Sequence, residues 1–360
     1  MSELKGQVCF ASGKTSDHDI WSLDLESGEI SQLTFGNHWN NKPHWSPDGK
    51  WVVFTSNRST YPEVFKVSAD GRKTTQLTEL NRWCDSPRFS PDGTRIAFVS
   101  NAEGNNNDIW IMDGDGGNRT QVTSHAGSDT WVDWTAGGQG LLWSSDRDER
   151  HADIWQWDLS NGHHTQLTTD DGADFNPVAS PCGQFIAYVS NRQLPTNPGN
   201  PFSDRDKDVW LMRSDGSSQV RLTSNQGCDF CICWSPCGSK LMYASNNDKT
   251  SSHLRVMDVS NVLEAFVSND RSAIEAAADK IRDEDVELDR SQLQAEIGAQ
   301  RTTTFVTRWM PESWVKACYP AGFFGQERYP HWIDLELAAN SYCGGSKSCR
   351  SAEQAQAANC

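Results

Sequence analysis

The chain has 360 residues, of which 36% are hydrophobic and 22% are charged, and its formal net charge is −16. This acidic excess argues against binding to a nucleic-acid backbone, which needs clustered lysine and arginine, and mildly against anionic membranes or anionic polymers as ligands. No apolar run reaches the ~18 residues of a membrane helix, so we expect no membrane insertion.

The N-terminal residues show no cationic segment followed by an apolar one. We therefore expect a cytoplasmic protein for the chain as given, and a periplasmic or secreted one if a signal peptide has been removed. A ring of repeats can absorb this length as one domain, and we expect a monomer.

One turn motif recurs along the chain with a period of about 45 residues, which is typical of propellers and other repeat folds. Its first copy reads Trp-Ser-Pro-Asp-Gly-Lys, and two later copies carry cysteine in place of the turn aspartate. The copies span 43–49, 87–93, 132–138, 177–183 and 232–238. The proline presets φ at the first corner of the turn, and the glycine tolerates the sharp reversal.

Each repeat unit contains four short segments with strand character. In one unit these are the segment that ends at Phe89, then 96–101, the segment that begins at 108–110, and 121–123. Four short strands rich in β-branched and aromatic residues describe one blade of a β-propeller. The sequence therefore predicts an all-β fold.

The combination Trp-Ser-Pro-Asp-Gly-Lys, Ile-Ala-Phe, Asp-Ile-Trp and Gln-Leu-Thr resembles the TolB-type, WD40-like (PD40) propeller repeat over about residues 6–268. The resemblance implies a propeller and, as for TolB-type propellers, a protein partner. Related blades also occur in prolyl-oligopeptidase-like peptidases and in some lyases of acidic polysaccharides. The activity must therefore be argued from a site.

Blade number depends on how the ring closes, because the first unit lacks its own inner strand. We expect blades 1–6 within residues 1–268 and a ring-closing strand or degenerate blade within 301–337, with 304–309 as the best closing strand. Six blades are favoured. Seven remain possible if 314–319 and 331–335 form a further, degenerate blade.

Two insertions interrupt the period. A proline-containing loop at 193–207 separates the second and third strands of blade 5, and a helical insertion is expected at 269–300. Ser272 with Glu275, and Ser291 with Gln294, form capping-box patterns for two helices. We expect a solvated helical hairpin over one face of the ring, followed by a polar, cysteine-containing tail at 338–360.

Eleven cysteines invite a search for a metal site. Cys228 and Cys231 have zinc-ligand spacing, but Cys233 falls on an inner strand and Cys237 in a turn, so the sulfurs should point in different directions. We therefore expect buried thiols and predict no cofactor. A divalent metal, Ca or Mn, is the alternative, although no acidic cluster completes a calcium loop.

The inner strands, and the loops that lead into them (the entry loops), can be aligned between repeats. Polar residues stand three positions before the repeat anchor, ahead of the inner strands, at Asn40, Asp129, Asp174 and Asp229. A second column holds His44, Arg88 and Asp133, with Arg308 from the expected closing strand. We expect both columns to face the channel and contact ligand. Alternatively, the Asn and Asp side chains cap their own loops, and charges pair to stabilise the ring.

Three tryptophans, Trp39, Trp83 and Trp131, lie in the entry loops outside the positions that pack between blades. Exposed rings of this kind stack on sugars or anchor peptides, so we include them as ligand-binding candidates.

Two functions follow. The first is a scaffold that binds a protein or saccharide through the channel mouth and entry loops. The alternative is a carbohydrate-active enzyme, such as a uronate-specific lyase, with His44, Arg88 and Asp133 as catalytic residues. No Gly-x-Ser-x-Gly elbow occurs, so peptidase or esterase activity is not expected.

Overall fold

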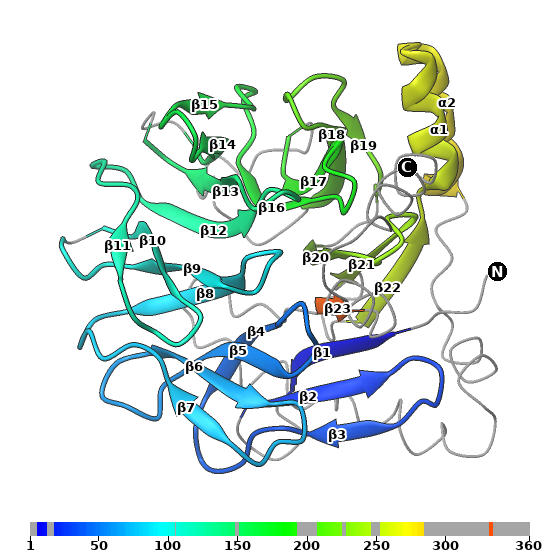
Figure 1. Cartoon of the computed structure of the whole chain (residues 1–360). Helices are drawn as coiled ribbons and strands as arrows, with labels where there is room; N and C mark the ends of the chain where they lie inside the picture. The colour runs from blue at the N-terminus through cyan, green and yellow to red at the C-terminus, as the bar shows by residue number, and fades with distance from the viewer. Residues whose placement is uncertain are drawn as a thin grey trace, which may run out of the picture.

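Six β-sheets are arranged around a common centre in the computed structural model of the chain (Figure 1). The structure describes residues 6–12, 18–104, 106–147, 151–192, 207–224, 228–245, 253–283 and 331–333. The first strand of each blade from blade 2 onward lies nearest the centre, and neighbouring inner strands contact one another around the ring. The fold is therefore the predicted six-bladed propeller.

The blades follow one another in chain order. Blade 1 contains β1 (Gln7–Ser12), β2 (Asp19–Asp24) and β3 (Ile30–Gln32). Blade 2 contains β4 (Asn40–Trp45), β5 (Trp51–Ser56), β6 (Glu63–Ser68) and β7 (Thr74–Gln76). Blade 3 contains β8 (Cys84–Phe89), β9 (Arg95–Ser100), β10 (Asp108–Asp113) and β11 (Thr120–Gln121).

The second half of the ring repeats this arrangement. Blade 4 contains β12 (Asp129–Trp134), β13 (Gly140–Ser145), β14 (Asp153–Asp158) and β15 (His164–Gln166). Blade 5 contains β16 (Asp174–Ala179), β17 (Phe185–Ser190), β18 (Asp208–Arg213) and β19 (Val220–Arg221). Blade 6 contains β20 (Asp229–Trp234), β21 (Lys240–Ser245) and β22 (His253–Asp258).

Each turn motif closes its hairpin with side-chain hydrogen bonds. In blade 2 the Ser46 hydroxyl donates to Asp48 Oδ1 over 2.6 Å and accepts from the Trp51 amide over 2.9 Å. Gly49 has a φ of 65°, which favours glycine. The recurrence of serine, aspartate and glycine in this motif is therefore explained by the turn itself.

A second set of repeat residues ties the outer strands together. In blade 1 the Thr34 hydroxyl donates to Asp19 Oδ1 over 2.9 Å and accepts from the Ile20 amide over 2.8 Å. The same threonine–aspartate contact recurs in blade 4 between Thr168 and Asp153, at 3.2 Å. The Asp-Ile-Trp and Gln-Leu-Thr segments are thus matched in every such blade because one bonds to the other.

The ring closes through β23 (His331–Ile333), which pairs antiparallel with β1 as the inner strand of blade 1. This strand comes from the segment that the sequence analysis assigned to a seventh blade. The favoured closing segment 304–309, and 314–319, lie outside the described residues. Blade 1 therefore takes its innermost strand from the C-terminal part of the chain, as expected, but from a later segment.

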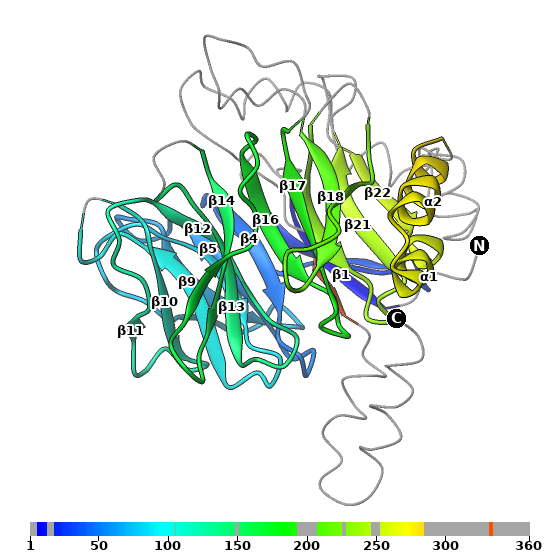
Figure 2. The same cartoon turned by 90° about the horizontal axis from the view of Figure 1, so that it is seen from above.

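The helices begin earlier than the sequence predicts. Helix α1 (Ser260–Ser268) follows β22 directly, and α2 (Arg271–Asp283) follows α1. Both lie along the outer edge of blade 6 (Figures 1 and 2) rather than over a face of the ring. Phe266 of α1 is fully buried against Phe185 of blade 5, with ring centroids 5.1 Å apart. The helices thus cover the outer edge where blade 6 has no fourth strand among the described residues.

The start of α2 also differs from the predicted capping box. The Ser272 amide donates to Asp270 Oδ1 over 2.9 Å, so Asp270 caps the helix. Glu275 instead accepts a hydrogen bond from Arg271 over 2.8 Å. The second predicted box at 291–294, most of the loop at 193–207 and the tail at 338–360 lie outside the described residues. None of the described helices has both the length and the apolarity to span a membrane.

Candidate functional site

The polar column at the start of the inner strands is fully buried. Its members in blades 2, 4, 5 and 6 are Asn40, Asp129, Asp174 and Asp229. In blade 4, Arg147 Nη2 lies 3.2 and 3.1 Å from the two carboxylate oxygens of Asp129, and Arg147 Nε donates to Ser145 over 2.8 Å. The guanidinium also lies 4.4 Å from the ring centroid of Trp155. Asp129 is therefore held inside its own blade.

Asn40 and Asp174 make the corresponding contacts. Arg58 Nη2 donates to Asn40 Oδ1 over 3.0 Å, and Arg192 Nη2 donates to Asp174 Oδ2 over 2.7 Å. Burial raises the pKa of Asp174 to about 6, against the lowering effect of the Arg192 charge. These contacts match the alternative in which the column stabilises the ring. Ligand contact by these residues stays a prediction.

The column of His44, Arg88 and Asp133 connects neighbouring blades. His44 Nδ1 accepts a hydrogen bond from the Phe89 amide over 3.2 Å, and Asp133 Oδ2 accepts one from the Ala179 amide over 3.2 Å. Burial raises the pKa of Asp133 to about 6, although the Arg88 charge lowers it. We expected this column to face the channel. In the structure His44 and Asp133 bond to the next blade; ligand contact and a catalytic role for this column stay predictions.

A β-bulge in the inner strand of each of blades 2–6 sets apart a different column of residues. The bulged residues all have positive φ although none is glycine: Lys42 (54°), Ser86 (52°), Trp131 (59°), Asn176 (51°) and Cys231 (58°). In every case the register with the second strand shifts at this step. A bulge re-aims the side chain, so these residues are directed differently from the alternating residues of the strand.

Lys42 shows where this column points, because its side chain reaches two other blades. Its ammonium nitrogen lies 2.5 Å from Asp85 Oδ2 and 2.9 Å from Ser86 Oγ, both in blade 3. It also lies 4.8 Å from the ring centroid of Trp131, in blade 4. Contacts across three successive blades place the ammonium at the ring centre. Lys42, Asp85, Ser86 and Trp131 are called the central cluster below.

The central cluster is largely removed from water. Lys42 and Asp85 are each 8% exposed, and Asp85 Oδ1 accepts a further hydrogen bond from Thr55 over 3.0 Å. Burial of an ion pair carries a desolvation cost, and the fold does not need an ion pair at this position. In the other blades the position of Lys42 holds serine, tryptophan, asparagine or cysteine, and the position of Asp85 holds asparagine, threonine or phenylalanine, so the repeat does not need the pair.

The opposite side of the ring centre is less polar. Cys228, Phe230 and Cys231 are buried together, with Trp131 packed against them. Asn176 accepts a hydrogen bond from the Ile232 amide over 3.2 Å. Cys228, Cys231 and Cys233 are buried thiols, and Cys237 is exposed. The described residues contain no group of three metal-ligating side chains that could hold an ion.

The entry-loop tryptophans are held differently from one another. The amides of Trp39 and Trp83 donate to Asn57 and Asn101 over 2.7 and 3.0 Å, which fixes two entry loops to their blades. Trp131 belongs to the central cluster. Arg308 lies outside the described residues. Of the predicted ligand-binding residues, only Trp131 is therefore placed beside the buried ion pair.

Lys42, Asp85 and Ser86 were missed by the sequence analysis. A signal existed for Lys42 and Ser86: the column one residue before the repeat anchor contains lysine, serine, tryptophan, asparagine and cysteine in successive blades. No shared structural role explains so wide a range of side chains. The direction of its side chains depends on a β-bulge, and no glycine at this position indicates the bulge in the sequence.

The fold and the repeat contacts define the class of this protein, which is a six-bladed β-propeller closed by a C-terminal strand. Residues 72–197 match the family model of the TolB beta propeller domain, PD40. This stretch of the chain thus resembles TolB-type PD40 propeller repeats. It covers the last strand of blade 2, blades 3 and 4, and the first two strands of blade 5.

Solved structures share this fold at low sequence identity. TolB from Acinetobacter baumannii aligns with a TM-score of 0.59 and 21% identity over 71% of this chain and 62% of that one. A putative TolB from Agrobacterium tumefaciens gives 0.57 and 22% over 71% and 85%. A chain of a nidogen/laminin complex gives 0.54 and 15% over 70% and 89%. These likenesses show the fold alone.

One curated relative matches over a short segment. It is the uncharacterized protein Atu1656 of Agrobacterium fabrum (strain C58 / ATCC 33970), which is 47% identical over 36 residues. The match covers 10% of this chain and 12% of that protein. It therefore adds a repeat-level similarity and no activity.

Proposed function

We propose that this TolB-type propeller is a binding scaffold that takes a charged segment of a protein partner at the ring centre, from the side of the entry loops. The observation that carries the proposal is the buried Lys42–Asp85 ion pair lying against Trp131. An ammonium group, a carboxylate and an aromatic face together can recognise a peptide group that carries charge beside an apolar body.

The surroundings of the entry loops support a protein partner. Phe35, in the connection between β3 and β4, is 64% exposed, and Tyr61, in the connection between β5 and β6, is 43% exposed. Aromatic residues are enriched at protein interfaces, where they provide large contact area at small entropic cost. The resemblance to TolB-type propellers also implies a protein partner. The central cluster would then supply specificity and the exposed aromatic residues additional contact area.

A library of linear peptides tests the proposal. Peptides selected on the wild-type chain should bind the Trp131→Ala variant and the Lys42→Met/Asp85→Asn double variant at least tenfold more weakly, measured by calorimetry. The double variant removes both charges and so avoids leaving one buried charge alone. Lys50→Met is the matched control, because Lys50 is 70% exposed and pairs with Asp48 in a turn at the other end of the blade. Selected peptides that bind all variants equally would refute the proposal.

The alternative proposal is a lyase that abstracts a proton next to a carboxylate with His44, Arg88 and Asp133. It is favoured by one observation: burial raises the pKa of Asp133 to about 6, close to the range of a general base, with the Arg88 charge nearby. Incubation with uronic-acid polymers, with and without a divalent metal, should then generate the absorbance of an unsaturated product. Absence of that absorbance under both conditions, or its persistence in Asp133→Asn, would exclude this mechanism.

A further inference from the structure

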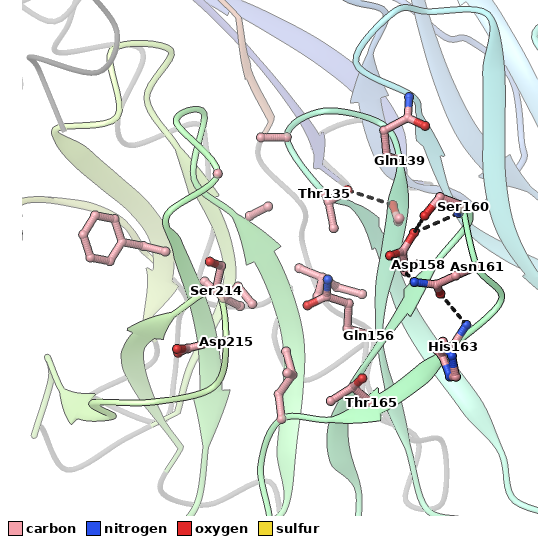
Figure 3. Close-up of a pocket in the computed structure, with 18 residues that line it drawn as sticks. Thr135, Gln139, Gln156, Asp158, Ser160, Asn161, His163, Thr165, Ser214 and Asp215 are labelled. Carbon is pink, nitrogen blue, oxygen red and sulfur yellow. Dashed lines mark hydrogen bonds between the residues drawn. The ribbon is translucent and has the colours of Figure 1, made fainter.

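A cleft of about 720 Å³ lies between blades 4 and 5 (Figure 3). It is lined by the turns that follow β12 and β14 and by the turn that follows β18, so it lies at the opposite end of the blades from the entry loops. Leu142, Leu167 and Ile186 contribute apolar surface, and polar side chains surround it. Both the volume and this mixed lining are typical of small-molecule sites.

The cleft exists partly because blade 4 lacks the turn proline. In blade 2 the proline packs against the turn glycine of the next blade: a Cβ atom at Gly93 would lie 3.4 Å from Pro47 Cδ. In blade 4 the same position is Ala136, and a Cβ atom at Gly183 would lie 3.3 Å from its methyl group. The methyl group maintains the contact, but the rest of the proline ring is missing.

A lysine fills the corresponding region between blades 2 and 3. Lys66 Nζ donates to the carbonyl oxygen of Gly114 over 2.7 Å, at the turn between β10 and β11. The Asp115 carboxylate attracts this ammonium group. The nitrogen also lies 5.0 Å from the ring centroid of Trp51. Blade 2 thus extends an ammonium group on an aliphatic stem to a carbonyl and a carboxylate of blade 3.

The interface between blades 4 and 5 has the receiving groups but lacks the lysine. Ser214 and Asp215 of blade 5 stand where blade 3 has Gly114 and Asp115, and both line the cleft. Gln156 replaces Lys66, and Gly140 replaces Trp51. The Gln156 side chain makes no hydrogen bond to any residue that the structure describes, and it lies inside the cleft in Figure 3. The space and the acceptors for an alkylammonium group are therefore present without the group.

The charge of the cleft favours the same ligand. Asp158, in the β14–β15 turn, adds a second carboxylate on the wall formed by blade 4. Hydrogen bonds from Ser160 to Asp158 and from Ser217 to Asp215 hold the pKa of each carboxyl below its usual range, so both are ionised at neutral pH. No lysine or arginine is among the described residues that line the cleft.

The arginine that precedes Ser214 is already engaged elsewhere. Arg213, which precedes Ser214, donates hydrogen bonds to the Phe266 carbonyl and to Asn269 Oδ1 at the end of α1. Its charge lowers the pKa of Asp215, but its guanidinium is directed toward the helix. Two carboxylates on opposite walls and an apolar surface between them match a chain of methylene groups with an ammonium group at each end.

We propose that this cleft binds a linear aliphatic diamine or polyamine, one ammonium group of which occupies the position that Lys66 Nζ occupies between blades 2 and 3. That ammonium group contacts the Ser214 carbonyl and Asp215, and the other approaches Asp158. The site is independent of the central cluster, because it lies at the other end of the ring.

Calorimetric titration of the full chain with spermidine and with 1,5-diaminopentane at physiological ionic strength tests the proposal. We expect one saturable site for each amine and no binding of pentane-1,5-diol, which has the same length without charge. Gln156→Lys supplies the lysine of blade 2 and should weaken binding at least tenfold. Ala136→Pro supplies the missing ring and should weaken it as well, and Asp215→Asn should weaken it severalfold.

Asp70→Asn is the matched control, because Asp70 holds the equivalent turn position in blade 2 and is not part of the cleft. It should leave the dissociation constant within twofold of that of the wild type. Equal binding to the wild type and to Gln156→Lys would show general attraction to an acidic protein and would overturn the proposal. Binding of the diol as tight as that of the diamine, or no saturable binding, would overturn it too.

Discussion

The pairing of Asp129 with Arg147 leads to a sharp prediction about stability. Arg147→Ala removes a guanidinium that contacts both carboxylate oxygens of a side chain with 0% exposure. The chain contains its own comparison: blades 2, 4 and 5 combine Asn or Asp with Arg58, Arg147 or Arg192, whereas blade 3 combines Cys84 with Ala102. The acidic or amide group and the arginine are thus present or absent together in these blades.

The expected cost follows from the burial. Removal of one partner of a buried ion pair leaves an uncompensated charge and destabilises a protein by roughly 3–5 kcal/mol. The lost cation–π contact with Trp155 contributes up to about 1 kcal/mol within that total. For a domain of this size the midpoint of thermal unfolding should fall by roughly 6–20 °C. The Asp129→Cys/Arg147→Ala double variant reproduces blade 3 and should recover more than half of the loss.

Thermal and urea unfolding followed by circular dichroism measure both effects. Arg72→Ala serves as the control, because Arg72 is 87% exposed and its contact with Asp70, at 3.6 Å, is a surface pair worth about 0–1 kcal/mol. A loss below about 1 kcal/mol in Arg147→Ala, or a double variant no more stable than the single one, would refute the reasoning.

Three further predictions concern other parts of the ring. Ala136→Pro should stabilise the chain by about 0.4–1 kcal/mol in urea unfolding, because the other turns accept proline at this position and the unfolded chain loses freedom; a destabilised variant would contradict the turn equivalence. Burial raises the pKa of Asp208 to about 7 from 3.8. Between these two values the folded state binds a proton that the unfolded state does not. The contribution of Asp208 to the free energy of unfolding therefore falls as pH rises from about 4 to 7, by at most about 1.4 kcal/mol per pH unit. Asp208→Asn should flatten that slope in unfolding measured across the range, and an unchanged slope would contradict the assignment. Phe266→Ala should lower the free energy of unfolding by roughly 3–5 kcal/mol. Val267→Ala, at a position 78% exposed, should leave it nearly unchanged in the same assay. Similar effects of the two substitutions would show that packing of α1 against the blades does not contribute to stability.

The sequence predicted the fold well because the residues that define it repeat. Ser46 and Asp48 bond within a single turn, and Thr34 bonds to Asp19 across two strands of one blade. Such local requirements leave the same residue types at these positions in most copies. Ring closure was harder to assign, because β23 has three residues and is defined only by its pairing with β1. A short strand whose partner lies about 320 residues away carries no local signal of its own.

The central cluster was hidden for a different reason. Side-chain direction in a regular strand alternates, and the alignment of His44 with Arg88 and Asp133 relied on that alternation. The bulge at Lys42 and at Trp131 breaks it through positive φ values of 54° and 59°. Glycine is the usual sequence mark of such a backbone, and neither residue provides it. The candidate columns were therefore identified, but their directions could not be assigned from the sequence.

The diamine cleft could have been inferred from the sequence by asking which side chains one blade lacks. Blade 4 departs from blade 2 at Pro47, Trp51 and Lys66, where it has Ala136, Gly140 and Gln156. Each change removes volume or charge, and the structure places all three beside one cleft. Gly140 cannot simply regain a side chain, because a Cβ atom there would lie 2.5 Å from the Trp157 carbonyl oxygen. Ala136 and Gln156 have no such obstacle, and the repeat itself supplies their replacements. Restoration of proline and lysine at these two positions therefore separates a binding role for the cleft from a requirement of the fold.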